Sequence, residues 1–145
     1  SGLTQWLMSP GDGSITEAQK DDLPAEFPRV HPELDGNKHR YGYCLGTGSM
    51  VKPDFGRFIK YDFVKDSREV YELPAHEFGA EPVFIPATNA TSEDEGYLIS
   101  FVYDQSTNGS SVQILNAQQI TEGPIAKVML PQRVPYGFHG SWVSA

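Results

Sequence analysis

The stretch "VPYGFHGSWVSA" places His139 directly after Phe138 and before Gly140, a few residues from the C-terminal end of the sequence. Packing in a hydrophobic core would explain Phe138 and Trp142, but it would not explain an imidazole at this position. The flanking glycines, Gly137 and Gly140, let backbone or a ligand approach the ring closely. His139 is therefore a candidate metal ligand. The alternative is a hydrogen-bonded core histidine, and the residues alone favour it.

Three further histidines, His31, His39 and His76, lie in stretches rich in turn-forming residues. The sequence contains no H-x-H or H-E-x-x-H pair, and no two histidines lie one helical turn apart. Spacing therefore gives no metal site within the chain. We interpret these three as loop or surface histidines.

Two glutamates differ from the other acidic residues, which fall mostly in turns such as "SEDEG". Glu26 opens "EFPRV" and Glu81 opens "EPVFIP", so each stands at the start of an apolar run. A carboxylate at the edge of a core is costly unless it is paired. One suitable partner is the N–H of a metal-bound imidazole, because the carboxylate then orients the ring. The alternative is an ordinary ion pair with Arg29, Arg40 or Lys38, and the sequence leaves both interpretations open.

Composition excludes several classes of protein. The 145 residues carry a net charge of −8, and the 11 basic residues are scattered, which argues against nucleic-acid binding. The single cysteine, Cys44, cannot form an internal disulfide, and we interpret it as a small apolar filler in "YGYCLG". The sequence shows no signal peptide, no apolar run of membrane-spanning length and no nucleophile motif.

The elements that must position these side chains are short, apolar runs separated by turn signals. They predict strands and hairpins at "LTQWLMS", "SITEAQK", "RYGYCLG", "GRFIKYDFV", "EVYEL", "PVFIPA", "YLISFVYD", "SVQILNA" and "IAKVMLP". Evidence for helix is thin, with one turn at "NAQQI". The pattern indicates an all-β protein: a sandwich, a barrel or a propeller. Meandering pairs of strands fit propeller blades, although no sharp internal repeat is present.

Taken together, these residues resemble the carotenoid cleavage oxygenase family, which includes apocarotenoid oxygenases and lignostilbene dioxygenases. The matching stretches occur in the family's order and are "EFPRVHPELDGNKHRYGY", "IKYDF", "AEPVFIP", "SEDEGYLISFVYD", "ILNA" and "LPQRVPYGFHGSWV". The resemblance implies consecutive antiparallel blades that form part of a seven-bladed β-propeller. Residues 1–145 would then be a C-terminal fragment of a single propeller domain, with the upstream blades absent.

The resemblance also implies an Fe(II) ion held on the propeller axis by four histidines, three of them backed by glutamates. His139 looks like the last of the four ligands, and Glu81 looks like the glutamate that supports it. Glu26 looks like the glutamate that supports another ligand, which lies outside this chain. The remaining histidines of the chain match no ligand position, so iron would need three further histidines from elsewhere.

The implied activity is that of an oxidoreductase, a dioxygenase that uses O2 to cleave a carbon–carbon double bond of a carotenoid, apocarotenoid or stilbene. Tyr136 and Phe138 are expected to line an apolar substrate tunnel, and Trp142 to pack in the core. We expect the 145-residue chain alone to bind no iron specifically, to be inactive and to self-associate through exposed strand edges.

We expect a cytoplasmic protein, and lipid-soluble substrates leave peripheral membrane contact of the full-length protein open. Two other functions also stay open. One is a metal-free β-rich binding or structural module. The other is a family member that isomerises or binds its substrate without cleaving it.

Overall fold

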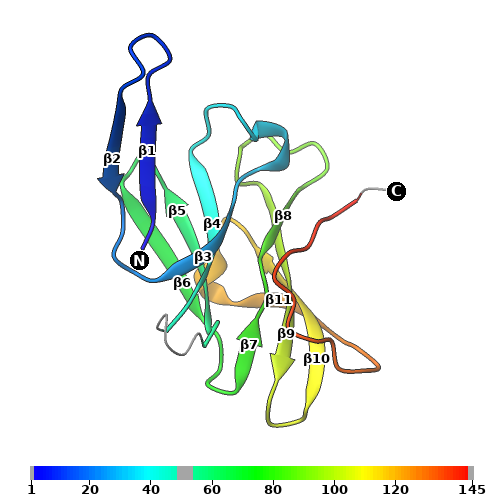
Figure 1. Ribbon diagram of the computed structural model, residues 1–145. Helices are drawn as coiled ribbons and strands as arrows, with labels where there is room; N and C mark the ends of the chain where they lie inside the picture. The colour runs from blue at the N-terminus through cyan, green and yellow to red at the C-terminus, as the bar shows by residue number, and fades with distance from the viewer. Residues whose placement is uncertain (1, 49–53, 144–145) are drawn as a thin grey trace.

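The structure is a computed structural model that describes residues 2–48 and 54–143. Its strands form three antiparallel sheets (Figure 1). A separate hairpin consists of β1 (Thr4–Met8) and β2 (Ile15–Gln19). The second sheet has the order β3 (Ala25–Arg29), β4 (Tyr41–Gly46), β5 (Arg57–Asp62) and β6 (Ser67–Glu72). The predicted all-β class and the predicted strands are confirmed.

The third sheet is built around β9 (Gly96–Asp104), which pairs on one side with β10 (Gly109–Asn116) and through it with β11 (Pro124–Met129). On its other side β9 pairs with two short strands in succession, β7 (Glu77–Gly79) and β8 (Val83–Pro86). This edge is therefore interrupted at residues 80–82. Two 3-10 helices, η1 (Pro32–Leu34) and η2 (Ile120–Glu122), complete the described elements.

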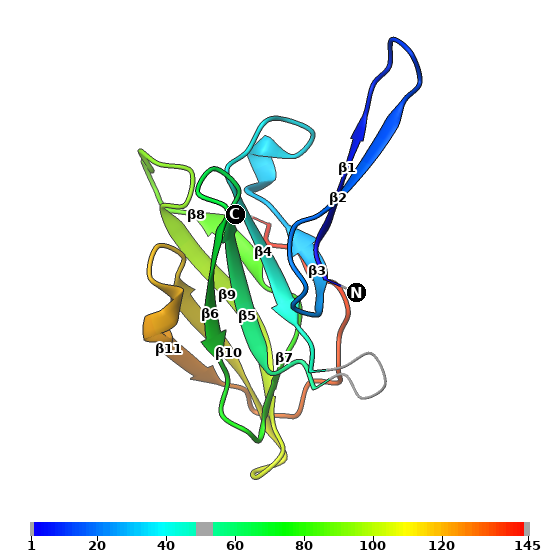
Figure 2. The same cartoon turned by 90° about the vertical axis from the view of Figure 1, so that its left-hand side faces the viewer.

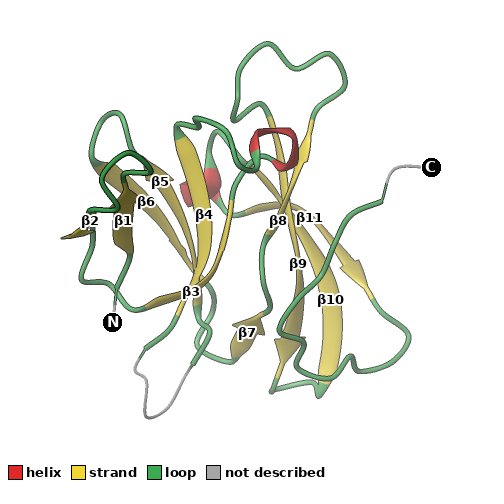
Figure 3. Cartoon of the chain, turned by 45° about the horizontal axis from the view of Figure 1, so that its top comes forward, coloured by secondary structure: helices red, strands yellow, loops and turns green. Residues whose placement is uncertain are grey.

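The main hydrophobic core lies between the second and third sheets, which Figure 3 shows as two neighbouring groups of strands. Tyr43 of β4 stacks on Phe84 of β8, with ring centroids 5.3 Å apart. A smaller cluster, which includes Cys44 and Ile59, fills the opposite face of the second sheet. Strands β4 and β5 are thus buried on both faces, as expected for the middle of a packed blade. Cys44 is the predicted apolar filler, and burial raises the pKa of its thiol to about 12.

Strand β7 is an element that the sequence did not reveal. It has three residues, and its last residue, Gly79, packs directly on the core. A Cβ added to Gly79 would lie 2.9 Å from the ring of Phe58. The close approach of β7 to β5 therefore requires a glycine at this position, and a glycine weakens any strand pattern.

A solvated loop is what the acidic turn "SEDEG" alone would suggest, and the structure shows that this interpretation is wrong. The Glu93 carboxylate accepts hydrogen bonds from the backbone N–H groups of Arg40 and Tyr41. The Asp94 carboxylate forms a buried ion pair with Lys60, with 2.7 Å between Nζ and Oδ2. Because Lys60 lies on β5 and the loop precedes β9, these contacts tie the second sheet to the third.

The hairpin β1–β2 projects from the two packed sheets (Figure 2). Its exposed apolar side chains are Trp6, Leu7, Met8 and Ile15. The outer face of the third sheet also exposes apolar side chains, including Phe101 and Val128. Such surfaces favour the predicted self-association, which stays a prediction.

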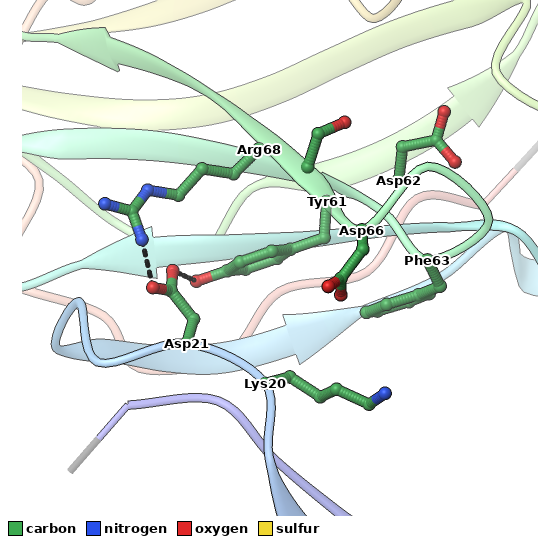
Figure 4. A pocket seen from close by; sticks show the side chains of 8 residues that line it. Lys20, Asp21, Tyr61, Asp62, Phe63, Asp66 and Arg68 are labelled. Atoms are coloured by element: carbon green, nitrogen blue, oxygen red, sulfur yellow. Dashed lines mark hydrogen bonds and ion pairs between the residues drawn. The ribbon is translucent and has the colours of Figure 1, made fainter.

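A buried carboxylate anchors the segment that follows the hairpin. Figure 4 shows Asp21 between the hydroxyl of Tyr61 and the guanidinium of Arg68, and both donate to it. Burial acts to raise the pKa of Asp21, but the hydrogen bonds from Tyr61 and Leu23 and the charge of Arg68 outweigh it. The pKa of Asp21 therefore lies below its ordinary value.

Neither helix in residues 2–48 and 54–143 is long and apolar enough to cross a membrane.

Replacing Asp94 by Asn should strongly destabilise the fold, because it leaves the buried charge of Lys60 without its partner. We expect the free energy of unfolding to fall by ~3–5 kcal/mol in denaturant titrations. Glu72→Gln is the control, because Glu72 is the exposed partner of Arg57. This substitution should lower the free energy of unfolding by under ~1 kcal/mol. The double variant Lys60→Met/Asp94→Leu should recover most of the loss. An Asp94→Asn variant as stable as the control would contradict the role of this ion pair.

Replacing Asp21 by Asn should give a stability loss that depends on pH. Because the folded-state pKa of Asp21 is lowered, its contribution is complete above the unfolded-state pKa of about 3.9 and is lost as pH falls further. In denaturant titrations, the free energy of unfolding of the parent should exceed that of the variant at pH 7, and this difference should become smaller toward pH 3. The control variant Asp22→Asn, at an exposed neighbouring position, should unfold with the same free energy as the parent. A stability loss in Asp21→Asn that does not change with pH would refute the prediction.

Candidate metal centre

Glu81 lies in the interruption between β7 and β8, where the edge of the third sheet leaves and rejoins β9. Ala80 is held there by Ser100, whose hydroxyl accepts from the Ala80 N–H at 3.2 Å and donates to the Ala80 carbonyl at 2.8 Å. Because the pairing with β9 stops after Gly79 and resumes at Val83, Glu81 is not part of the strand pairing. Its side chain can therefore turn toward the C-terminal segment instead of alternating across the sheet.

Four donors converge on the Glu81 carboxylate, whose side chain is only 4% exposed. Oε1 accepts from Nε of Arg29 at 2.9 Å and lies 3.3 Å from Nδ1 of His139. Oε2 accepts from Nη2 of Arg29 at 3.0 Å and from the backbone N–H of Gly140 at 2.9 Å. Glu81 therefore pairs both with an arginine and with the imidazole of the candidate ligand, and its support of a metal-bound ring stays a prediction.

These contacts fix the ionisation of Glu81. Burial acts to raise its pKa, but the hydrogen bonds from Arg29, Gly140 and His139 outweigh it and leave the pKa below the ordinary value. An ionised carboxylate can only accept, so Nδ1 of His139 must carry the shared proton. The Nε2 lone pair of a neutral imidazole is then free to bind a metal ion.

His139 stands at the rim of an apolar cavity of about 450 Å³. Its side chain is 73% exposed, so the alternative of a buried core histidine is wrong. Phe27 contacts the imidazole edge-on, with ring centroids 5.3 Å apart. The cavity is lined mainly by β8, β9 and the C-terminal segment, with Val83, Ile99, Phe101, Val112 and Trp142 among its residues. The geometry therefore joins one available imidazole nitrogen to a space suited to an apolar molecule.

The aromatic residues around His139 differ in what they contact, and the role of Tyr136 and Phe138 in a substrate tunnel stays a prediction. Trp142 is 58% exposed and lines the cavity, so its assignment to the core is wrong. Phe138 is exposed and packs against Phe27. Tyr136 is exposed and lies against Tyr103 of β9 and Phe78 of β7. Neither Phe138 nor Tyr136 lines the cavity formed by the described residues.

Glu26 is not part of this cluster. It lies half-buried on β3 opposite Leu45, at a bulge that separates it from Arg29. Phe27, the next residue, has a φ of 55°, which is uncommon outside glycine. Among residues 2–48 and 54–143, Glu26 makes no ion pair and no side-chain hydrogen bond. Its role in supporting a second ligand stays a prediction.

The other histidines occupy loops, as predicted. Nδ1 of His31 accepts from the backbone N–H of Glu33 and caps η1, and Nδ1 of His39 lies 3.0 Å from the Asn37 carbonyl. His76 is exposed in a turn before β7. Within the described ranges, no three histidine, cysteine or acidic residues come together in a way that could hold a metal ion. Among the described histidines, His139 is the one whose ring lies within hydrogen-bond distance of a carboxylate, while His76 Nε2 lies 3.8 Å from Asp104 Oδ1.

The chain is similar in sequence to proteins of one known family. Residues 1–144 match the family described as retinal pigment epithelial membrane protein. The chain is 37% identical to carotenoid 9,10(9',10')-cleavage dioxygenase 1 of Pisum sativum over 91% of its length, and 34% identical to a carotenoid cleavage oxygenase of Mycobacterium tuberculosis over 97%. It spans 27% and 28% of those two relatives.

The fold is also that of a solved relative. The structure of cobalt-substituted Synechocystis apocarotenoid oxygenase superposes on 99% of this chain with a TM-score of 0.92 and 28% sequence identity, and the match covers 30% of that protein. The predicted consecutive antiparallel blades of a β-propeller are thereby confirmed. The chain belongs to the retinal pigment epithelial membrane protein family, which includes carotenoid and apocarotenoid cleavage oxygenases.

Proposed function

We propose that this chain is the C-terminal part of an Fe(II)-dependent dioxygenase that cleaves a carbon–carbon double bond of a carotenoid or apocarotenoid. A stilbene is the other conjugated substrate that the sequence leaves open. The observation that carries the proposal is the contact between Glu81 and His139 at the rim of an apolar cavity. A carboxylate-backed imidazole is a common arrangement for a metal ligand. The relatives named above are cleavage oxygenases, which supports the same reaction for this chain.

The residues present fit one position in an all-histidine iron site. His139 would contribute Nε2, Glu81 would support it, and three further histidines would come from outside the chain. When bound, Fe(II) would supply the activation of O2 that the side chains cannot perform. Since one imidazole cannot hold iron against water, the 145-residue chain alone should neither retain iron specifically nor show activity.

The residues of this chain would prepare that reaction in two ways. Glu81 keeps the proton on Nδ1 of His139, so that Nε2 stays a lone-pair donor aimed away from the carboxylate. The apolar side chains of the cavity would hold the substrate through van der Waals contact and exclude water. Orientation of a long, stiff substrate in such a space determines which bond reaches the metal.

Replacing His139 by Ala in the complete protein should abolish iron retention and cleavage. The change removes one of four proposed ligands, and the side chain that it removes is 73% exposed in this chain. Iron content after gel filtration and product formation from carotenoid or stilbene substrates are the measurements. His76→Ala is the matched control, because His76 is also exposed, and it should keep both properties. Unchanged iron in the His139→Ala variant would reject the metal site and favour a metal-free module.

The complete protein also tests whether this family member isomerises or binds its substrate without cleaving it. Iron that depends on His139, together with substrate that is bound or isomerised but never cleaved, would reject the dioxygenase and leave the metal site standing.

Replacing Glu81 by Gln should weaken iron binding without removing a ligand. An amide of the same size loses the negative charge that orients and polarises His139, and second-layer changes of this kind typically cost ~10–100-fold in metal affinity. Competition with a chelator measures the effect. Glu77→Gln is the control, since Glu77 is a similarly buried carboxylate on β7 that pairs with Lys127 instead. Equal iron affinity in the two variants would contradict a supporting role for Glu81.

A further inference from the structure

We propose that Arg29 is a positioning residue for His139, a role that rests on the proposed iron site. Arg29 ends β3 and is remote in sequence from the C-terminal segment. Its guanidinium binds the Glu81 carboxylate through two parallel hydrogen bonds. It also donates from Nη2 to the carbonyl of Gly140, at 2.5 Å. One side chain thus holds both the carboxylate that supports His139 and the backbone that follows it.

The C-terminal segment makes aromatic contacts, such as Phe138 with Phe27 and Tyr136 with Tyr103, but it depends on this clamp for its hydrogen bonds beyond Val134. Strand β11 ends at Met129, and residues 130–143 form no regular secondary structure. The backbone is tied to β10 at Leu130 and Val134, through the carbonyl and hydroxyl of Ser110. Among residues 2–48 and 54–143, the hydrogen bonds made by residues 135–143 are those of His139 and Gly140 with Glu81 and Arg29.

The clamp joins three parts of the fold through one set of hydrogen bonds. Arg29 belongs to the second sheet, Glu81 to the interrupted edge of the third sheet, and Gly140 to the C-terminal segment. Oε2 of Glu81 accepts hydrogen bonds from both Arg29 and Gly140, and these two bonds fix the plane of the carboxylate. The orientation of that plane determines where Oε1 lies relative to Nδ1 of His139. Removing Arg29 should therefore let the imidazole of His139 adopt other orientations, although His139 itself remains present.

The chemistry of the contact favours arginine over lysine. A guanidinium presents parallel N–H groups that match both oxygens of a carboxylate and can still reach a carbonyl. An ammonium group restores the charge but not this planar fork, so Arg29→Lys should rescue only part of the function.

The test compares Arg29→Gln and Arg29→Lys with Arg40→Gln in the complete protein. Arg40 is a matched control, because it forms the same two-pronged pair with Asp62 on β5 and is 36% exposed against 39% for Arg29. Fe(II) dissociation constants from chelator competition should rise ~10-fold or more in Arg29→Gln, by less in Arg29→Lys, and not at all in Arg40→Gln. A purely structural role would move Arg29→Gln and Arg40→Gln together, and that result would overturn the proposal.

A second measurement does not need iron. Hydrogen exchange of the Gly140 amide in the metal-free protein should speed up at least tenfold in Arg29→Gln relative to Arg40→Gln, because the clamp that orders its acceptor is lost. Equal exchange would overturn the proposal.

The two proposals fail differently. If His139→Ala retains iron, the proposed function fails. If His139→Ala loses iron while Arg29→Gln binds it as tightly as Arg40→Gln, only the positioning role of Arg29 fails.

Discussion

The ionised, buried carboxylate of Glu81 is the constraint on which the site depends. A charge with 4% of its side chain exposed is tolerated only because donors satisfy both of its oxygens. Those donors come from Arg29 on β3 and from His139 and Gly140 in the C-terminal segment, and so from two parts of the chain that are far apart in sequence. Satisfying one charge therefore dictates where the C-terminal segment lies and which nitrogen of the imidazole stays available.

The fold supplies this constraint through an irregularity rather than through a regular element. The edge of the third sheet is divided between β7 and β8, and Glu81 occupies the gap. The bulge in β3, with its positive φ at Phe27, brings Arg29 to the carboxylate and the Phe27 ring to His139. Local strain of this kind persists where surrounding packing determines it, and it often accompanies a functional site. The two packed sheets act as the rigid support that makes both irregularities possible.

The sequence revealed the residue types of the site but not how they are joined. Glu81 could be singled out because a carboxylate beside an apolar run needs a partner, yet arginine and imidazole both qualified and the structure uses both. Strand β7 escaped notice because three residues ending in glycine carry no periodic signal. The buried pair of Lys60 and Asp94 was hidden within an acidic run that a solvated loop explains equally well. Trp142 was assigned to the core because hydrophobicity alone does not distinguish an aromatic residue that packs from one that lines a cavity.

The central claim is that Glu81 holds the proton of His139 on Nδ1 and leaves Nε2 bare. Nitrogen-15 NMR of the neutral imidazole in the metal-free chain tests it most directly. The account predicts a protonated Nδ1 and an unprotonated Nε2, with the preference relaxing once Glu81 is replaced by Gln. A neutral ring with its proton on Nε2 in the unmodified chain would contradict the account, because the nitrogen assigned to the metal would then have no free lone pair.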